Sequence, residues 1–421
     1  MFCYFIVFAA IVFNSLAARV ELDWNVGYVF GARDGYTYRR AIGVNGKLPF
    51  PSVHVMQGDT LVINVHNSLD VPTSIHTHGL FNNGTNYYDG PDMVTQCGIP
   101  PGENFTYVFE TKDQFGTFWV HGHTRHQEAD GFHTPLIIHS RKQPVIVYDE
   151  ELTMTFEDWY TTEFYVRQEY IESLEDARTL VPNYPRALIN GYDGNNTAPI
   201  TFVPKRRYRL RIICMSLTVN KFIDKHHVLL NALSSSLYKP VLVPTLYTAL
   251  SMGDLAKNSS VYGPQTNAYV LKHLEVVEIV INNPIGDDHT FHFHGHNVQV
   301  IETGPYGNSS TDNRKPVAHQ QSELWPMWRD TVQVRAYGFI RVRFRADNPG
   351  VWFLHCHLAI HMYNGLAVVF VEAPDVLQQR QSVPEAMVEM CKRQGILTQG
   401  NGAGNQGFDL SGLPPAIYLP S

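Results

Sequence analysis

Residues 355–361 read His-Cys-His-Leu-Ala-Ile-His, which places one cysteine between two histidines and a third histidine five residues after the cysteine. A cysteine thiolate with two imidazoles is the ligand set of a blue copper centre, which is trigonal with a weak axial partner. Alternate side chains of an extended strand point to opposite faces. Cys356 can therefore bind one copper ion while His355 and His357 reach other metal ions behind it. This spacing predicts an electron-accepting copper ion connected through one strand to a second copper cluster.

Further histidines recur in pairs that are separated by one residue. The chain has 20 histidines among 421 residues, a composition for which random placement gives roughly one His-x-His pair. The five pairs that occur are His76/His78, His121/His123, His292/His294, His294/His296 and His355/His357. On a strand, residues i and i+2 share a face about 6.6 Å apart, at about 3.3 Å per residue. Paired imidazoles can therefore ligate adjacent metal ions.

Strands must position these residues, and the composition agrees with a strand-and-turn protein. Glycine and proline number 31 and 25, and aromatic residues make up 12% of the chain. Residues 20–145 and 240–373 alternate apolar strands with Gly, Pro and Asn turns, which is the pattern of β-sandwich domains. Residues 375–394 have helical composition, and residues 400–407 indicate a flexible tail. We therefore predict an all-β fold with His-x-His pairs in both sandwich domains.

The first 18 residues form an apolar run that ends in small residues, which is typical of a secretory signal peptide. Beyond this leader, no run approaches the roughly 18 apolar residues of a membrane span. Asn-x-Ser/Thr sequons strengthen the prediction of a secreted or extracellular cell-surface protein. They begin at Asn83, Asn104, Asn195, Asn258 and Asn308. The net charge of −7 argues against nucleic acid as a partner, because nucleic acid binding needs basic patches.

With these motifs in this order, the chain resembles the multicopper oxidases, and among them the fungal ferroxidases of iron uptake. The resemblance implies cupredoxin-like Greek-key β-sandwich domains, O2 as electron acceptor, and four copper ions (one type 1, one type 2 and two type 3). The implied type 1 ligands are His289, Cys356 and His361, the type 2 ligands are His76 and His292, and the type 3 ligands are His78, His121, His123, His294, His355 and His357. His296 matches no ligand position and is interpreted as a residue behind the ligands or part of the scaffold.

The resemblance also implies roles for residues around the metal ions. Leu366 occupies the axial position of the blue copper, and since leucine cannot coordinate, it implies a fairly high potential. Asp89 matches an acid near the type 2 copper that supplies protons, and its alternative reading is a turn aspartate before glycine. Ala359 stands where the family has a second acid, which predicts slower oxygen reduction. Cys97 and Cys391 match a disulfide that ties the first domain to the C-terminal end.

The middle of the chain is shorter than the resemblance implies. We place the domains at residues 19–145, 146–239 and 240–394, followed by a flexible tail at 395–421. The second range is too short for a complete cupredoxin domain, and Cys214 within it is read as a buried free thiol or an intermolecular pair. A truncated sandwich exposes strand edges, so we expect a rearranged small domain or a homo-oligomer, unless the gene model is defective. Because every implied ligand lies in the first or last domain, the copper sites can still assemble within one chain or between two.

For the reducing substrate, the resemblance and the local residues point in different directions. Ferroxidases of this type hold Fe2+ with carboxylates beside the blue copper, whereas the matching positions here are Pro182 and Ile285. Asp287 and Asp288 lie close by and are tentative substitutes, although an acidic turn explains them equally well. We expect a ferroxidase that supplies an iron permease. Two alternatives stay open: a laccase-like oxidase of phenols or aromatic amines that uses a small aromatic reductant, and an inactive copper-binding paralogue.

Overall fold

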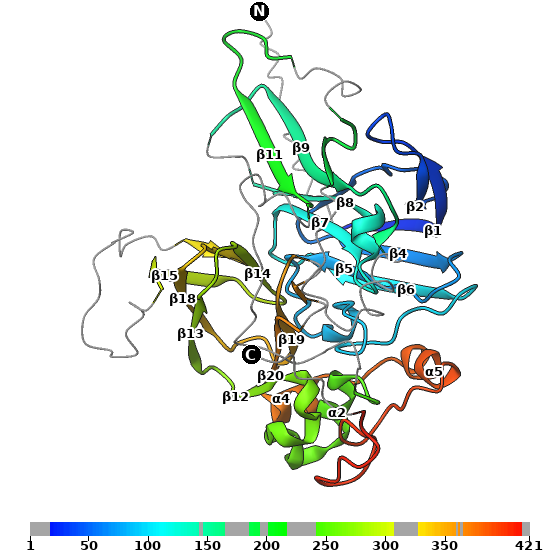
Figure 1. Ribbon diagram of the computed structural model, residues 1–421, viewed down its shortest axis with the longest axis vertical. Coiled ribbons are helices and arrows are strands. Elements are labelled where there is room, and N and C mark those ends of the chain that lie inside the picture. The colour runs from blue at the N-terminus through cyan, green and yellow to red at the C-terminus, as the bar shows by residue number, and fades with distance from the viewer. Residues whose placement is uncertain are drawn as a thin grey trace, which may run out of the picture.

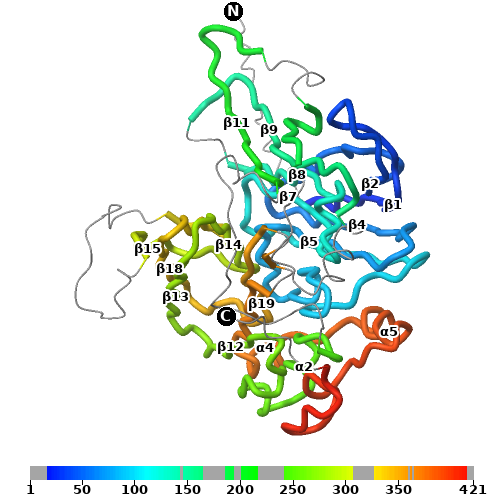
Figure 2. The backbone as a smooth tube through the Cα atoms, viewed as in Figure 1, coloured from blue at the N-terminus to red at the C-terminus, as the bar shows by residue number. Residues whose placement is uncertain are grey.

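The computed structural model describes residues 17–142, 146–164, 185–193, 201–216, 241–306, 327–358, 361–362 and 365–414. Its strands build two sandwich domains side by side, with a small third sheet next to the N-terminal domain (Figures 1 and 2). Helices are short and lie between or after strands. The predicted all-β fold is therefore confirmed.

The N-terminal domain consists of two four-stranded sheets. The sheet with the order β2-β1-β4-β6 contains β1 (Arg19–Gly31), β2 (Arg39–Val44), β4 (Thr60–Asn67) and β6 (Asn104–Glu110). The sheet with the order β3-β8-β7-β5 contains β3 (Val53–Met56), β5 (Ile75–His78), β7 (Gly116–Gly122) and β8 (His133–His139). The 3-10 helices η1 (Asn86–Tyr88) and η2 (Gln127–Asp130) follow β5 and β7. Phe105, Tyr107 and Phe109 alternate inward along β6, as the period of two requires.

The C-terminal domain pairs a five-stranded sheet with a four-stranded one. The sheet with the order β12-β20-β19-β14-β17 contains β12 (Ala268–Leu271), β14 (His289–Phe293), β17 (Thr331–Val334), β19 (Gly350–Cys356) and β20 (Ala367–Glu372). The sheet with the order β13-β18-β15-β16 contains β13 (Val276–Asn283), β15 (Val298–Pro305), β16 (Trp328–Arg329) and β18 (Gly338–Arg345). Phe291, Val342 and Phe370 pack between the sheets.

Short helices precede and follow the strands of this domain along the chain. Those before it are α2 (Thr245–Ser251), η4 (Gly253–Lys257), η5 (Ser259–Tyr262) and η6 (Pro264–Thr266). Those after it are α4 (Pro374–Arg380) and α5 (Glu385–Arg393). The helix expected over residues 375–394 is thus two helices. Gln381 is already extended, and Pro384 disfavours helical geometry in the residue before it.

The middle segment contributes a three-stranded sheet in the order β10-β9-β11. It contains β9 (Glu150–Trp159), β10 (Arg186–Ile189) and β11 (Tyr208–Cys214). Buried charge fixes this sheet to the N-terminal domain, because Glu157 on β9 pairs with Arg33 and lies 3.0 Å from Nε2 of His133.

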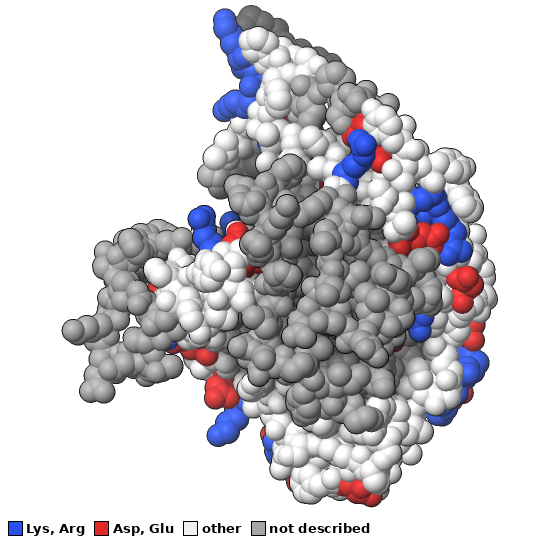
Figure 3. Space-filling view, viewed as in Figure 1, with Lys and Arg blue, Asp and Glu red and all other residues white. Residues whose placement is uncertain are grey.

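On the surface, acidic and basic side chains lie next to each other along the outer rim near β1 and β2 (Figure 3).

The two sandwich domains share a continuous core. One cluster of buried apolar side chains joins residues of the N-terminal sheets, such as Leu61 and Ile75, to Phe353 and Val369 of the C-terminal domain. Polar contacts reinforce the junction: the side chain of Asn86 donates to the Val351 carbonyl and accepts from the Val351 amide, both at 2.9 Å. The domains are therefore held face to face without the middle segment.

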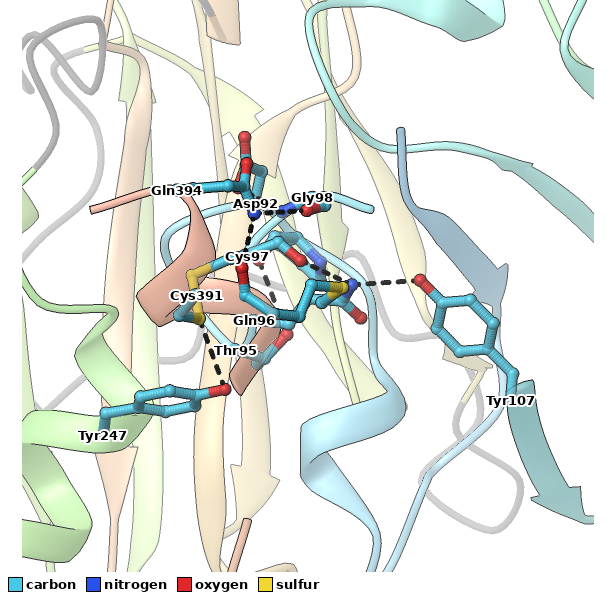
Figure 4. Close-up of a disulfide and its surroundings, with 11 residues drawn as sticks. Asp92, Thr95, Gln96, Cys97, Gly98, Tyr107, Tyr247, Cys391 and Gln394 are labelled. Carbon is cyan, nitrogen blue, oxygen red and sulfur yellow. Dashed lines mark hydrogen bonds between the residues drawn. A yellow bond between two sulfur atoms is a disulfide. The ribbon is translucent and has the colours of Figure 1, made fainter. Parts of the chain in front are cut away.

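A disulfide closes this junction. Cys97 of the N-terminal domain and Cys391 of α5 are bonded with an S–S distance of 2.07 Å, beside the Tyr247 hydroxyl (Figure 4). This is the pairing that the resemblance implies. In contrast, Cys214 is a free, exposed thiol, so the expectation of a buried thiol is wrong, and an intermolecular pair stays a prediction.

The C-terminal tail is not flexible where the structure describes it, which corrects our expectation. Asn401 is fully buried, and its side chain donates to the carbonyls of Gly407 and Asp409. The amide of Gly402 donates to the Val261 carbonyl at 2.7 Å. The glycines therefore serve tight turns around a buried asparagine. The segment after residue 414 lies outside the described residues.

Candidate copper centres

Four strands carry the predicted ligands to the junction of the two sandwich domains. β5 and β7 are antiparallel, with His76 opposite His121. β14 and β19 are paired in the same way, with His292 opposite His355. Each strand pair therefore presents its histidines side by side, and the shared core of the two domains brings the two groups of histidines together at the junction.

The imidazoles of the two domains interleave. Nε2 of His76 lies 3.3 Å from Nε2 of His292, and the rings of His78 and His292 stack with centroids 3.6 Å apart. The rings of His123 and His355 lie 5.5 Å apart. The complete group consists of His76, His78, His121, His123, His292, His294, His355 and His357. Histidines from both ends of the chain thus converge within a single chain.

Hydrogen bonds at the outer nitrogens show that a cation belongs at the centre. Nδ1 of His76 donates to the Asp89 carbonyl at 2.6 Å. Nδ1 of His292 donates to the Asp330 carbonyl at 3.1 Å. The Nε2 atoms of both rings are then unprotonated, and their lone pairs face each other across 3.3 Å. With metal–nitrogen bonds of about 2.0–2.1 Å, this separation gives an N–metal–N angle of roughly 105°.

A second pair repeats this arrangement. Nδ1 of His294 donates to the Asp89 carboxylate at 2.8 Å, and Nδ1 of His355 donates to the Cys356 carbonyl at 3.1 Å. Nε2 of His294 and Nε2 of His355 then face each other at 3.1 Å. His123 joins these two in a group whose ligand atoms lie within 4.8 Å of one another. Each of these sites therefore fits a metal ion.

Burial keeps His78, His292 and His357 neutral and able to ligate. Burial, together with the neighbouring histidines, lowers the pKa of His78 and His292 well below the ordinary value. Burial also lowers the pKa of His357 to about 4. Within the cluster, the buried Nε2 atoms that have no hydrogen-bond partner in the described part of the chain belong to His121, His123 and His357. Unpaired buried nitrogens are costly, and metal ligation would satisfy them.

The third site lies on the opposite face of β19. Sγ of Cys356 is 3.7 Å from Nδ1 of His289 and 3.5 Å from Nδ1 of His361. A trigonal ion with bonds of about 2.3 Å to sulfur and about 2.0 Å to nitrogen would place the sulfur and nitrogen atoms roughly 3.7 Å apart. Burial raises the pKa of the Cys356 thiol to about 12, so a bound cation has to displace its proton. The geometry fits the His2Cys set of a blue copper ion.

Comparison with known proteins decides the family. Models described as multicopper oxidase match residues 25–143, 150–230 and 238–376. The iron transport multicopper oxidase fetC of Epichloe festucae is 31% identical, over 97% of this chain and 86% of its own length. The iron multicopper oxidase fer1 of Mycosarcoma maydis is 30% identical, over 96% of this chain and 89% of its own length. The chain belongs to the multicopper oxidase family.

Solved structures agree with this assignment. The crystal structure of Fet3p, a multicopper oxidase that functions in iron import, superimposes with a TM-score of 0.79 at 26% identity, covering 96% of this chain and all of Fet3p. The laccase of Botrytis aclada superimposes with a TM-score of 0.66 at 23% identity, covering 90% of this chain and 91% of the laccase. This similarity shows the shared fold. The alignment to the Epichloe protein runs over 537 positions, although this chain has 421 residues. More than a hundred positions therefore lack a counterpart here.

In this multicopper oxidase, the residues predicted to support the ligands are placed as follows. Asp89 is completely buried and contacts two ligand rings, so it is more than a turn residue. Leu366 lies beside the blue site, where its carbonyl accepts the amide of Cys356 at 2.9 Å. His296 lies behind the cluster, with Nε2 2.9 Å from the buried carboxylate of Glu372. The axial role of Leu366 and the proton-supplying role of Asp89 stay predictions.

The tentative iron acids of the oxidase are less favourably placed. Both carboxylate oxygens of Asp288 are engaged, because they accept from the Ala336 amide at 2.7 Å and from the Gln333 side chain at 2.9 Å. Asp287 is buried. Among the described residues, no group of metal-ligating side chains contains either aspartate. The positions of Ala359 and Pro182 lie outside the described residues.

One candidate site residue of the oxidase escaped sequence analysis. Asp330 joins His78 and His292 in a group of possible metal ligands. No His-x-His spacing marks it, and its contact with His78 spans 252 positions of the sequence. The only available signal was its place in Trp328-Arg329-Asp330-Thr331, directly before a strand that pairs with β14.

Proposed function

We propose that the chain is a four-copper oxidase that couples one-electron oxidations of a reductant to the reduction of O2 to water. The blue copper ligands would be His289, Cys356 and His361; the type 2 ligands would be His76 and His292; the type 3 ligands would be His78, His121, His123, His294, His355 and His357. The observation that carries this proposal is the pairing of unprotonated Nε2 atoms, between the two domains for His76 and His292 at 3.3 Å and within the C-terminal domain for His294 and His355 at 3.1 Å.

The side chains of this oxidase have separate tasks. Bound copper supplies the one-electron redox chemistry and the binding of oxygen. Cys356 lies next to His355 and His357 in the chain, so the peptide links the blue site to the cluster covalently. Asp89 fixes His76 and His294 through hydrogen bonds at their Nδ1 atoms, and its carboxylate is our candidate for handing on the protons that water formation consumes.

For the reductant we propose Fe2+, since the Epichloe relative is named an iron transport multicopper oxidase and the Mycosarcoma relative an iron multicopper oxidase. The test is O2 uptake by the copper-loaded protein with Fe2+ as sole reductant. We expect saturable uptake with four iron ions oxidised per O2. The double variant Asp287→Ala plus Asp288→Ala should raise the KM for Fe2+ if these acids bind iron. Copper binding without iron-dependent O2 uptake would refute the ferroxidase proposal.

One observation favours a small aromatic reductant as the second candidate. A cavity of about 440 Å³ reaches His289 and Leu366 between the two C-terminal sheets. Apolar side chains such as Val277, Ile279 and Phe370 line much of it, and the volume suits a single-ring ligand. Faster turnover on a phenol than on Fe2+ would establish this alternative. Normal copper content without O2 consumption on either reductant would instead indicate an inactive copper-binding paralogue.

Location and partners follow from the same proposal. The apolar leader, the disulfide and the exposed sequon residues Asn83, Asn104 and Asn258 support secretion to the cell surface, where disulfides persist. Across the described ranges, no helix has the length and hydropathy to cross a membrane. An iron permease is the proposed partner for ferric product, and a homo-oligomer remains proposed. Co-purification with a permease and light scattering of the secreted protein test these two points.

A further inference from the structure

Asp330 contacts ligands of both sandwich domains at once. It belongs to the C-terminal domain, immediately before β17. Its main-chain carbonyl accepts Nδ1–H of His292, in its own domain, at 3.1 Å. Its carboxylate oxygen Oδ2 lies 3.0 Å from Nδ1 of His78, in the N-terminal domain. One residue thus meets two rings of the cluster, His292 through a main-chain hydrogen bond and His78 through a close contact between carboxylate and imidazole.

Asp89 makes the mirrored set of contacts from the other side. It belongs to the N-terminal domain, and its carbonyl accepts Nδ1–H of His76, in its own domain, at 2.6 Å. Its carboxylate Oδ2 accepts Nδ1–H of His294, in the C-terminal domain, at 2.8 Å. Each aspartate therefore uses its carbonyl within its own domain and its carboxylate across the junction.

We propose that Asp330 is a positioning residue for the copper cluster and the counterpart of Asp89, so that the two aspartates form a reciprocal clasp across the domain junction. This inference rests on the ligand assignment of the proposed function. A carboxylate that accepts a ring N–H fixes the tautomer and the orientation of a metal-binding histidine. Asp330 would thus keep His78 aligned while its carbonyl aligns His292.

The two halves of the clasp differ in exposure. The Asp89 side chain is fully buried, whereas the Asp330 side chain is 29% exposed. Asp330 lines a cavity of about 540 Å³ together with His78, Trp119 and His357. Water in this cavity can replace part of a deleted carboxylate, so a variant at position 330 should fold. This makes Asp330 the more informative half to test.

The experiment compares Asp330→Ala and Asp330→Asn with the wild-type chain, and Asp347→Asn serves as the exposed-carboxylate control. We measure copper per protein after dialysis against a graded chelator, the blue absorbance, and kcat and KM for the reductant. Loss of an outer-shell partner weakens metal affinity or activity by about 10–100-fold. We expect Asp330→Ala to lose cluster copper in that range and to lower kcat, while the blue absorbance and KM stay within twofold. Asp330→Asn keeps an acceptor oxygen and should fall between wild type and alanine.

Several outcomes would overturn the proposal. Full copper retention and unchanged kcat in Asp330→Ala would show that His78 needs no such partner. Equal and complete copper loss in both variants would make Asp330 a direct ligand instead of a positioning residue. Loss of the blue absorbance together with cluster copper in Asp330→Ala would indicate general misfolding. Asp330→Asn, which replaces one carboxylate oxygen by an amide nitrogen, should then keep the fold, and an equal loss in this variant would overturn the proposal. If the wild-type chain binds no copper, the proposed function fails before any variant is compared.

Discussion

Breaking the disulfide should test how the domain junction is stabilised. The Cys97–Cys391 bridge closes a loop with a sequence separation of 294 residues, which includes the middle segment and nearly all of the C-terminal domain. We propose the double variant Cys97→Ser plus Cys391→Ser. The folded junction keeps its shared apolar core and the Asn86–Val351 hydrogen bonds, so the variant should still assemble the cluster.

The magnitude follows from the loop. A cross-link stabilises mainly by removing entropy from the unfolded chain, and for a separation of 294 residues the chain-entropy relation gives about 5.7 kcal/mol at 25 °C. Residual structure in the unfolded chain reduces this gain, and removal of native disulfides typically costs about 2–5 kcal/mol. We therefore expect a loss of about 3–5 kcal/mol in the free energy of unfolding, with kcat and blue absorbance nearly unchanged.

Urea unfolding followed by tryptophan fluorescence measures this loss by linear extrapolation. The matched control is Cys214→Ser, which removes a free, exposed thiol and should change the free energy of unfolding by less than about 0.5 kcal/mol. A loss below about 1 kcal/mol in the double variant would refute the entropic argument. A collapse of copper content at unchanged solvent conditions would show that the bridge shapes the folded junction itself.

Three further perturbations have defined outcomes. Arg33 and His133 hold the pKa of Glu157 below its ordinary value of 4.5, although burial alone would raise this pKa. Glu157→Gln should therefore lower the free energy of unfolding by about 3–5 kcal/mol near pH 7. The difference from wild type should shrink as the pH falls below about 4.5, and urea unfolding at several pH values measures it. Leu366→Met supplies an axial sulfur and should lower the potential of the blue site in a redox titration, at a stability cost below about 1.5 kcal/mol. Chelation of all copper should lower the unfolding midpoint in calorimetry, since a ligand at 1,000 times its Kd adds about 4 kcal/mol.

Sequence analysis reached the copper ligands because their spacing is a local property. His-x-His on a strand puts two imidazoles on one face whatever the rest of the chain does, and β5 holds His76 and His78 in this way. The Cys356 motif works by the same alternation. The resemblance then supplied the Cys97–Cys391 pairing, which spacing alone could not give.

What escaped prediction depends on contacts between distant residues or on buried polar groups. Asp330 gains its role only when His78 of the other domain is 3.0 Å away. The tail looks flexible by composition, because its glycines give no sign that Asn401 is buried among backbone carbonyls. Asp288 looks like an available acid in the sequence, but Gln333 of β17 and the Ala336 amide after it engage both of its oxygens.

The shortened middle segment keeps the parts that serve the other two domains. On β9, Glu157 binds the segment to the N-terminal domain through Arg33. On β11, Ile213 and its neighbours form one wall of the cavity that opens on His78 and His357. The ligands and both clasp aspartates lie elsewhere, so among the described residues of the middle segment this wall is its contribution to the surroundings of the cluster. A chain can therefore lose much of a family domain and keep its metal centre, provided that the lost residues neither ligate nor shield it.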